Sequence, residues 1–392
     1  MSEWKKCAIG DVVTLRQGFA INAKSKHYIS KVPTSLALLR IADMKSGSRE
    51  IYVKEDIPRN FIAQPQDIVY TRTGNVGLVF RNNYGVVHNN CFTVTPNDEK
   101  TLSRDFLYYL LQSKYFFEKA NSLARGAAQP DLPHSLFNSI EISYPDLDCQ
   151  QRIADILSNY DSLIENYQKQ IKLLEEAAQR LYKEWFVDLR FPGHEHTKII
   201  DGVPDGWTRS SLEEICSVSK KVISPSNIEK GRPYIGLEHI PRKDFCLSVW
   251  GNSEDISSSK YEYKENDILF GKIRPYFHKV GFAINNGYAS TDSIIMQSKL
   301  GLWGLLLMTV YSDRFVKNTS QACKEGAKMP RADWNQMKKY PILIASDNVQ
   351  YTFERYIKIT ANRIKEVATQ IRLLTEARDR LLPKLMSGEI AV

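Results

Sequence analysis

The sequence IADILSNYDSLIENYQKQIKLLEEAAQRLYKEW, residues 153–185, determines how the rest of the chain is organised. Its apolar residues recur in alternating steps of four and three, which is the spacing of a coiled-coil seam. Because the segment contains no Pro or Gly, it can form one helix of roughly 50 Å at 1.5 Å per residue. The predicted seam positions are Ile153, Leu157, Tyr160, Ile164, Tyr167, Ile171, Leu174, Ala178, Leu181 and Trp185.

A related segment follows 200 residues later, where QIRLLTEARDRLLPKLM at 370–386 aligns with QIKLLEEAAQRLYKEWF at 170–186. The matched length and shared register favour pairing of the two helices as a coiled coil. The alternative is two amphipathic helices that each pack only on their own globular domain. The second predicted seam consists of Phe353, Ile357, Ile364, Val367, Ile371, Leu374, Leu381 and Leu385, with the polar residues Thr360 and Arg378 at the two remaining positions.

The composition is that of an ordinary globular protein large enough for two domains. The chain has 392 residues, of which 43% are hydrophobic and 25% charged, so disorder is not expected. The longest apolar run, 300–311, is shorter than the roughly 20 residues that a membrane span requires, and no signal-peptide core is evident. We therefore expect a cytoplasmic protein without a membrane partner. Six scattered cysteines without a CxxC pair fit reduced thiols and predict no zinc site.

The two segments outside the helices repeat one plan. The first contains strand-like stretches at 36–44, 66–74 and 140–144, and a helix around 104–120. Its motif DIVY at 67–70 returns as DILF at 267–270, and Gly126, Ala127 and Pro130 also recur 200 residues later. The predicted fold is therefore α+β, with an internal pseudo-twofold repeat and two α/β domains joined by two long helices that form an antiparallel coiled coil. The predicted boundaries are a first domain at 1–149, the central helix at 150–190, a linker at 191–206, a second domain at 207–349, and the C-terminal helix and tail at 350–392.

No motif for catalysis was found. The sequence lacks GxxxxGK, GxGxxG, HExxH and GxSxG patterns, and also the Asn/Asp-Pro-Pro-Tyr/Phe signature of amino-methyltransferases. Asp255, Glu262 and Lys264 loosely resemble the triad of a metal-dependent nuclease. Such spacing is common by chance, and the first half has no counterpart. We therefore predict a protein that is not an enzyme and holds no metal or cofactor, with a metal-dependent nuclease as an alternative.

Three loops carry the chemistry of DNA contacts, and the formal net charge of +8 fits a polyanionic partner. After the first DIVY strand, an Arg and an Asn could form bidentate bonds to guanine and adenine, beside a Gly that allows close approach of the backbone. After the DILF strand, cationic residues surround two aromatic residues. Loop 124–132 and its counterpart could add phosphate contacts. The predicted contacts are Arg72, Thr73, Gly74, Asn75, Arg125, Gln129, Lys272, Arg274, Tyr276, Phe277, His278, Lys279 and Lys328.

Each loop also has a structural interpretation. The first two could be solvated hairpins with a packed aromatic residue, and the third could be a Gly turn before a strand. A non-DNA coiled-coil adaptor would explain the helices but not the polar, basic loops.

Four stretches together resemble one family: DIVYTRTGNVG at 67–77, GAAQPDL at 126–132, FGKIRPYFHKVG at 270–281 and RLLPKLMSGEI at 380–390. With the two variable segments and their related helices, the chain resembles a specificity (S) subunit of a type I restriction-modification enzyme. The resemblance implies two target recognition domains that read an asymmetric bipartite site on double-stranded DNA.

The resemblance also implies partners. Two methyltransferase subunits would bring S-adenosylmethionine, and restriction subunits, which act as motor and nuclease, would bring ATP and magnesium. The specificity subunit of that family does no chemistry itself. One departure is that the second loop lacks the GxxG spacing of the first, so the two loops need not contact DNA in the same way.

Overall fold

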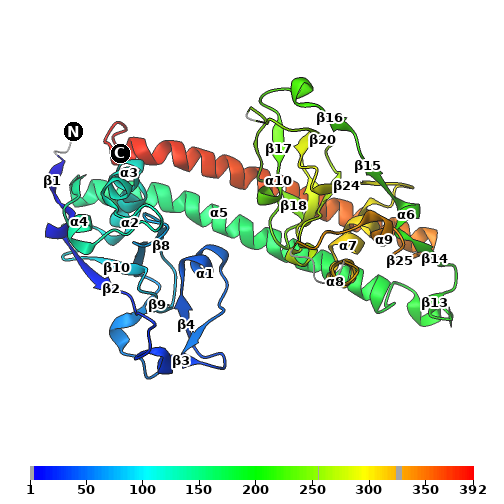
Figure 1. The fold of residues 1–392 in the computed structure, drawn as a ribbon, viewed down its shortest axis with the longest axis horizontal. Coiled ribbons are helices and arrows are strands. Elements are labelled where there is room, and N and C mark those ends of the chain that lie inside the picture. Colours follow the sequence, from blue (N-terminus) through cyan, green and yellow to red (C-terminus); the bar gives the residue numbers. More distant parts are fainter. Residues whose placement is uncertain (1–3, 255, 324–328) are drawn as a thin grey trace. The chain divides into compact units, whose positions relative to one another are not determined.

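The computed structural model describes residues 4–254, 256–323 and 329–392. The chain divides into two compact units (Figure 1). Unit 1 consists of Met1–Ser162 and Thr375–Val392, and unit 2 consists of Leu163–Leu374. In the figure the globular part of unit 1 is blue to cyan, and that of unit 2 is green to orange. Both long helices contribute residues to both units.

Unit 1 contains two main sheets. Its strands are β1 (Lys5–Ala8), β2 (Val13–Gln17), β3 (Ile29–Ser30), β4 (Leu36–Leu39), β5 (Tyr52–Val53), β6 (Ile62–Ala63), β7 (Ile68–Thr71), β8 (Val79–Phe80), β9 (Gly85–Val87), β10 (Cys91–Pro96) and β11 (Glu141–Tyr144). An antiparallel sheet has the order β2-β10-β7-β8. A second sheet has the order β3-β5-β4-β9-β6, in which β4 and β9 run parallel. Strands β1 and β11 form a separate antiparallel pair.

The helices of unit 1 differ from the prediction in two places. They are α1 (Ile41–Ser46), α2 (Arg104–Gln112), α3 (Lys114–Leu123) and α4 (His134–Asn138), with short 3-10 turns η1 (Ile9–Asp11), η2 (Lys26–Tyr28) and η3 (Arg59–Phe61). The strand predicted at 36–44 ends at Leu39, because Arg40 forms an ion pair with Asp43 in the first turn of α1. The helix predicted around 104–120 is two helices. The break lies at Ser113, whose hydroxyl accepts a hydrogen bond from the Phe116 N–H and so caps the start of α3.

Residues from distant parts of the sequence form the core of unit 1. Tyr70, Phe92 and Phe137 pack with ring centroids 5.0 to 5.4 Å apart. Leu385 and Met386, from the C-terminal helix, are buried in the same cluster. The core is therefore complete only when residues near both ends of the chain are present.

Unit 2 repeats the topology of unit 1. Its strands are β12 (Ile199–Ile200), β13 (Val203–Pro204), β14 (Thr208–Ser211), β15 (Cys216–Ser219), β16 (Val222–Ile223), β17 (Pro233–Ile235), β18 (Cys246–Leu247), β19 (Gly251–Asn252), β20 (Lys260–Tyr263), β21 (Ile268–Gly271), β22 (Val280–Ala283), β23 (Gly287–Ala289), β24 (Ser293–Ser298) and β25 (Pro341–Ile344). The order β15-β24-β21-β22 matches β2-β10-β7-β8, and β18 extends it. The order β20-β23-β17 matches β6-β9-β4, and β17 and β23 again run parallel. The pair β14-β25 corresponds to β1-β11.

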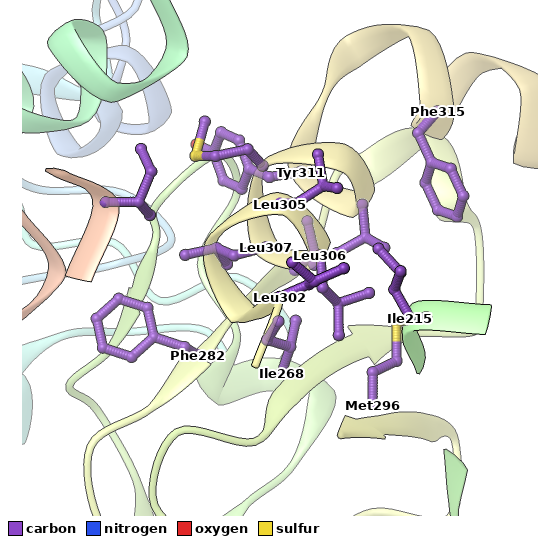
Figure 2. Close-up of a cluster of buried hydrophobic side chains, with 14 of the residues drawn as sticks. Ile215, Ile268, Phe282, Met296, Leu302, Leu305, Leu306, Leu307, Tyr311 and Phe315 are labelled. Carbon is purple, nitrogen blue, oxygen red and sulfur yellow. The ribbon is translucent and has the colours of Figure 1, made fainter. Parts of the chain in front are cut away.

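The helical elements of unit 2 are short apart from the two long helices. They are α6 (Leu212–Ile215), α7 (Trp303–Tyr311), α8 (Asp313–Gln321) and α9 (Trp334–Met337), with 3-10 turns η5 (His194–His196), η6 (Pro225–Asn227), η7 (Leu237–His239) and η8 (Pro275–Phe277). Most of the apolar run at 300–311 forms α7, which lies in the core (Figure 2), whereas Leu300 before the helix is 76% exposed. Leu302 and Leu306 gather there with Ile268 and Met296. Within the described residues, no helix is long and apolar enough to cross a membrane.

The segment predicted as a linker, 191–206, contains regular structure. Strands β12 and β13 form a hairpin whose two turn residues, Asp201 and Gly202, have φ of 51° and 74°. Two consecutive positive φ values are typical of a type I′ turn, which Asp-Gly favours. Phe191 is buried against Trp207, with ring centroids 4.6 Å apart. This segment is therefore folded against the core of unit 2.

The two long helices are α5 (Leu147–Tyr182), which continues as the π-helical turn η4 (Lys183–Val187), and α10 (Asp347–Met386). In unit 2, Trp185 after α5 packs on Phe353 in the first turns of α10, at 5.9 Å between ring centroids. In unit 1, Asp161 early in α5 bonds Arg378 late in α10, at 2.8 Å. These two contacts give the helices opposite directions, as predicted.

Every predicted seam residue is buried or half-buried. The seam residues also belong to the cores of the units. Ile153 and Leu157 lie in the core of unit 1, and Phe353 and Ile357 lie in that of unit 2. Pairing of the helices and packing on the globular domains, which the sequence left as alternatives, therefore occur together.

Candidate nucleic-acid interface

In unit 1, the first and third predicted loops lie against each other. The backbone that follows β7 forms hydrogen bonds with loop 125–132, as donor in one bond and as acceptor in another. Gly74 N–H donates to the Pro130 carbonyl at 2.8 Å, and Leu132 N–H donates to the Arg72 carbonyl at 2.9 Å. Arg125 and Asp131 exchange two N–H···O bonds, each 2.8 Å long. Residues 72–75 and 125–132 therefore form one surface, which sequence spacing did not reveal.

Arg72 is held in a fixed position on this surface. Its guanidinium donates to both carboxylate oxygens of Asp131, from Nε at 3.1 Å and from Nη2 at 2.7 Å, and Nη1 donates to Gln17 Oε1 at 3.1 Å. The Thr73 hydroxyl donates to the same carboxylate at 2.6 Å. The hydrogen bonds from Arg72 lower the pKa of Asp131 below its ordinary value, although burial opposes this. Asp131 thus remains charged and orients Arg72.

The other predicted residues of unit 1 are open to solvent. Gly74, Asn75, Arg125 and Gln129 are exposed, and no ion pair involves the Arg125 side chain among the described residues. Gly74 has φ of 81°, a conformation that favours glycine, and a Cβ there would meet no atom within 4 Å. A ligand backbone can therefore approach this turn closely.

Unit 2 builds the same backbone arrangement with other side chains. Arg274 N–H donates to the Pro330 carbonyl at 2.8 Å, and Ala332 N–H donates to the Lys272 carbonyl at 2.9 Å, just as Gly74 and Leu132 do in unit 1. The counterpart of Asp131 is Arg331, which pairs with Asp292 at 2.8 Å. The position that carries a carboxylate in unit 1 therefore carries a guanidinium in unit 2. Both Asp131 and Arg331 were missed as site residues, although Asp131 lies in the GAAQPDL motif.

The second loop presents both cations and aromatic rings. Lys272 Nζ donates to the Thr291 carbonyl at 2.6 Å, and Lys279 Nζ donates to the Leu237 carbonyl at 2.5 Å. Burial lowers the pKa of each lysine from its ordinary value. Tyr276 is 55% exposed and packs edge-on against Phe277, 4.9 Å away between ring centroids. The cations of Arg242 and Arg274 lie over the Phe277 ring, at 4.1 and 5.8 Å from its centroid.

His278 has a structural position. It is only 4% exposed, and its Nδ1 lies 3.2 Å from the Asp313 carboxylate. Its ring contacts Tyr311, with centroids 4.9 Å apart. Burial lowers the pKa of the imidazole. Neither a base nor a phosphate can therefore reach the ring in this conformation, so His278 is not placed to contact DNA directly.

Two predicted residues, Lys328 and Asp255, lie outside the described residues. Glu262, from the possible nuclease triad, forms ion pairs with Lys221 and with Arg232. Among the described residues, no group of three or more His, Cys, Asp or Glu side chains could hold a metal ion.

Comparisons with known proteins identify the class. Residues 1–176 match the family model described as type I restriction modification DNA specificity domain. The chain is 27% identical over 417 residues to the type I restriction enzyme MjaIX specificity subunit of Methanocaldococcus jannaschii, covering 100% of this chain and 94% of that protein. It is 23% identical over 473 residues to the HindI specificity subunit of Haemophilus influenzae, covering 100% of both. The type I S subunit of M. genitalium shares the fold, with a TM-score of 0.62, 17% identity and coverage of 98% of this chain and 96% of that one.

Residues 1–176 thus belong to the DNA specificity domains of type I restriction-modification systems. Along its full length, the chain is similar in sequence to type I specificity subunits and has the S-subunit fold. The chain therefore resembles type I specificity subunits in both sequence and fold. The resemblance inferred from the sequence motifs is confirmed.

Proposed function

We propose that this chain is the DNA-reading, non-catalytic subunit of a type I restriction-modification complex. In this proposal the two units read the two halves of an asymmetric bipartite site on double-stranded DNA. Two methyltransferase subunits that bind S-adenosylmethionine dock on the chain, and restriction subunits that use ATP and magnesium join them. The chain itself supplies recognition and a docking scaffold.

The supporting observation is the shared loop scaffold with exchanged charges. The same backbone hydrogen bonds position Arg72 with Asp131 in unit 1, and Lys272 with Arg331 in unit 2. A guanidinium beside a DNA groove can form a bidentate bond to guanine, and lysine makes a less directional contact. One scaffold with two different side-chain sets therefore suits two unlike half-sites.

The test begins with the complex of this chain and its methyltransferase subunits. Sequencing that detects methylated adenine in host DNA would give the recognised motif. Changing Arg72 to Ala should then cost roughly 1 to 3 kcal/mol in discrimination at one base pair of one half-site, and Arg331→Ala should affect only the other half-site. Uniform weakening on all sequences with a shallower salt dependence would assign Arg72 to a phosphate instead. A folded complex that binds no DNA would favour the coiled-coil adaptor.

A further inference from the structure

A pocket of about 340 Å³ lies beside the second recognition loop. It is formed within unit 2 by residues of β15, β20, β24 and α9, together with Lys272, which directly follows β21. The lining residues that carry polar or aromatic groups include Lys220, Tyr261, Lys272, Ser293, Trp334 and Asn335. Cations, aromatic surface and amide groups in one pocket are the chemistry that proteins use to hold a nucleic-acid strand.

The lining of the pocket carries two lysines, Lys220 and Lys272, and one carboxylate, Asp333. Lys220 is exposed, and the described residues give its ammonium group no ion-pair partner. Lys272 Nζ lies 5.4 Å from the centroid of the Tyr261 ring. Burial lowers the pKa of Lys272, and the neighbouring charges of Arg331 and Lys220 lower it further, while Asp292 opposes this effect. The carboxylate in the lining, Asp333, accepts the Asn335 N–H at 3.0 Å at the start of α9.

Two polar groups of the pocket have open hydrogen-bonding capacity. Ser293 is fully buried in the pocket wall, and its hydroxyl has no partner among the described residues. Asn335 is exposed at the rim. Its backbone N–H donates to Asp333, and its side chain has no hydrogen-bond partner among the residues that the structure describes.

The corresponding place in unit 1 is occupied by side chains. Strand register makes Gln17 the counterpart of Lys220. Gln17 is the last residue of β2 and pairs with Phe92 of β10. Lys220 directly follows Ser219, the last residue of β15, which pairs with Ile295 of β24. In unit 1, Arg72 bonds both Gln17 and Asp131. In unit 2, Arg331 instead forms an ion pair with Asp292, and Lys272 donates a hydrogen bond to the Thr291 carbonyl. Because these two side chains bond to other partners, the pocket stays open.

We propose that this pocket holds one backbone phosphate of the DNA strand between Lys220 and Lys272, with Asn335 facing the adjoining base. The inference rests on the proposed function, because it takes unit 2 to be a DNA reader. It adds a second contact region beyond the loop that follows β21. It also makes the two units unequal, since unit 1 closes the same place with its own ion pair.

The test compares Lys220→Ala with Lys198→Ala in the complex with methyltransferase subunits. Lys198 is an exposed lysine of the same unit that directly precedes β12, and it does not line the pocket. Lys220→Ala should weaken binding about tenfold on matched and mismatched duplexes alike, the loss expected of one charge-assisted contact. The slope of log K against log salt should fall by about 1. Lys198→Ala should change neither quantity.

A second variant tests the base contact. Asn335→Ala should lower discrimination at a single base pair of one half-site and leave the salt slope unchanged. If Lys220→Ala and Lys198→Ala bind DNA equally well while the wild-type complex is specific, the phosphate site is wrong and the proposed function stands. If the wild-type complex binds no DNA, the proposed function itself fails. Loss of binding to the methyltransferase subunits on Lys220→Ala would instead make the pocket a protein-docking site and overturn the proposal.

Discussion

At the scale of the residue, the main finding is that Asp131 controls Arg72. The sequence indicated Arg72 as a DNA contact from residue type and loop position. It could not indicate the bidentate pair with Asp131, because the partners are 59 positions apart and are brought together by a sheet whose register no local pattern encodes. The burial of His278 was likewise not predictable, because its environment comes from α8 and Tyr311.

Asp131 should act as a positioning residue for Arg72. Asp131→Asn keeps the shape of the side chain but removes its charge, so Arg72 loses its fixed orientation. We expect reduced discrimination at the same base pair that Arg72→Ala affects. The double variant should be no worse than Arg72→Ala, because residues that act through one another are not additive. Additive losses, measured by binding to duplexes with single substitutions, would show that Asp131 acts independently.

The buried carboxyl of Glu175 should make stability depend on pH. Glu175 is 6% exposed and accepts the Phe245 N–H at 2.6 Å. Burial raises its pKa from 4.5 to about 7. Its protonated form therefore stabilises the fold fully below pH 4.5, and this contribution is lost as the pH rises through about 7. Across that window the loss is up to about 3 kcal/mol.

Substitution of this carboxyl gives the measurement. Glu175→Gln keeps an acceptor for the Phe245 N–H but cannot ionise, so its advantage in urea unfolding should grow from pH 5 to pH 8. Glu176→Gln, at an exposed neighbouring position, serves as the control and should show no such trend. An equal effect of the two substitutions at every pH would contradict the assignment.

At the scale of the element, the long helices were predictable and the strands were less so. The seam repeats every seven residues over more than 30 positions, and so long a regular pattern outweighs local exceptions. Short strands have no comparable signal. The stretch at 36–44 was therefore assigned to one strand, although the Arg40–Asp43 pair starts α1 within it. The seam pattern also left Arg378 unexplained, and the structure pairs it with Asp161.

The Asp161–Arg378 pair should couple the two helices within unit 1. Both side chains are about three-quarters buried, and the Tyr109 hydroxyl also donates to Asp161, at 2.7 Å. Removing one partner leaves the other poorly solvated without its counter-charge. Asp161→Ala and Arg378→Ala should each destabilise the chain, and the double variant should be less unstable than their sum by about 0.5 to 3 kcal/mol. Chemical unfolding of the four proteins measures this coupling, and a value near zero would show that the pair contributes nothing.

At the scale of the whole molecule, the duplication gives one chain two loop scaffolds of the same topology with different side chains. Residues offset by about 200 positions occupy the same topological places, down to the backbone bonds of the recognition loops. The repeat was visible in the sequence because motifs such as DIVY and DILF survive in buried strands. The sequence did not show that Leu385 and Met386 belong to the core of unit 1, because this depends on how the folded helix α10 packs.

Exchange of one predicted domain should change one half-site. Replacing residues 1–149 with the matching segment of a related specificity subunit should alter one half of the methylated motif and leave the other half intact. The donor segment must accept Ile153, Leu157, Leu385 and Met386 of this chain, since these residues complete the core of unit 1. Motif sequencing of host DNA is the measurement. A change in both halves would contradict two independent readers.

The place of Leu385 and Met386 in the core of unit 1 has a consequence during protein synthesis. The ribosome completes the strands of this unit before residue 163, yet it adds these two residues more than 200 positions later. At roughly 5 to 20 residues per second, the delay is about 10 to 40 seconds. During that time the nascent unit has an apolar gap where α10 will pack, and unit 2 can complete its own core first. The domain that is translated first is thus the last to reach its native state.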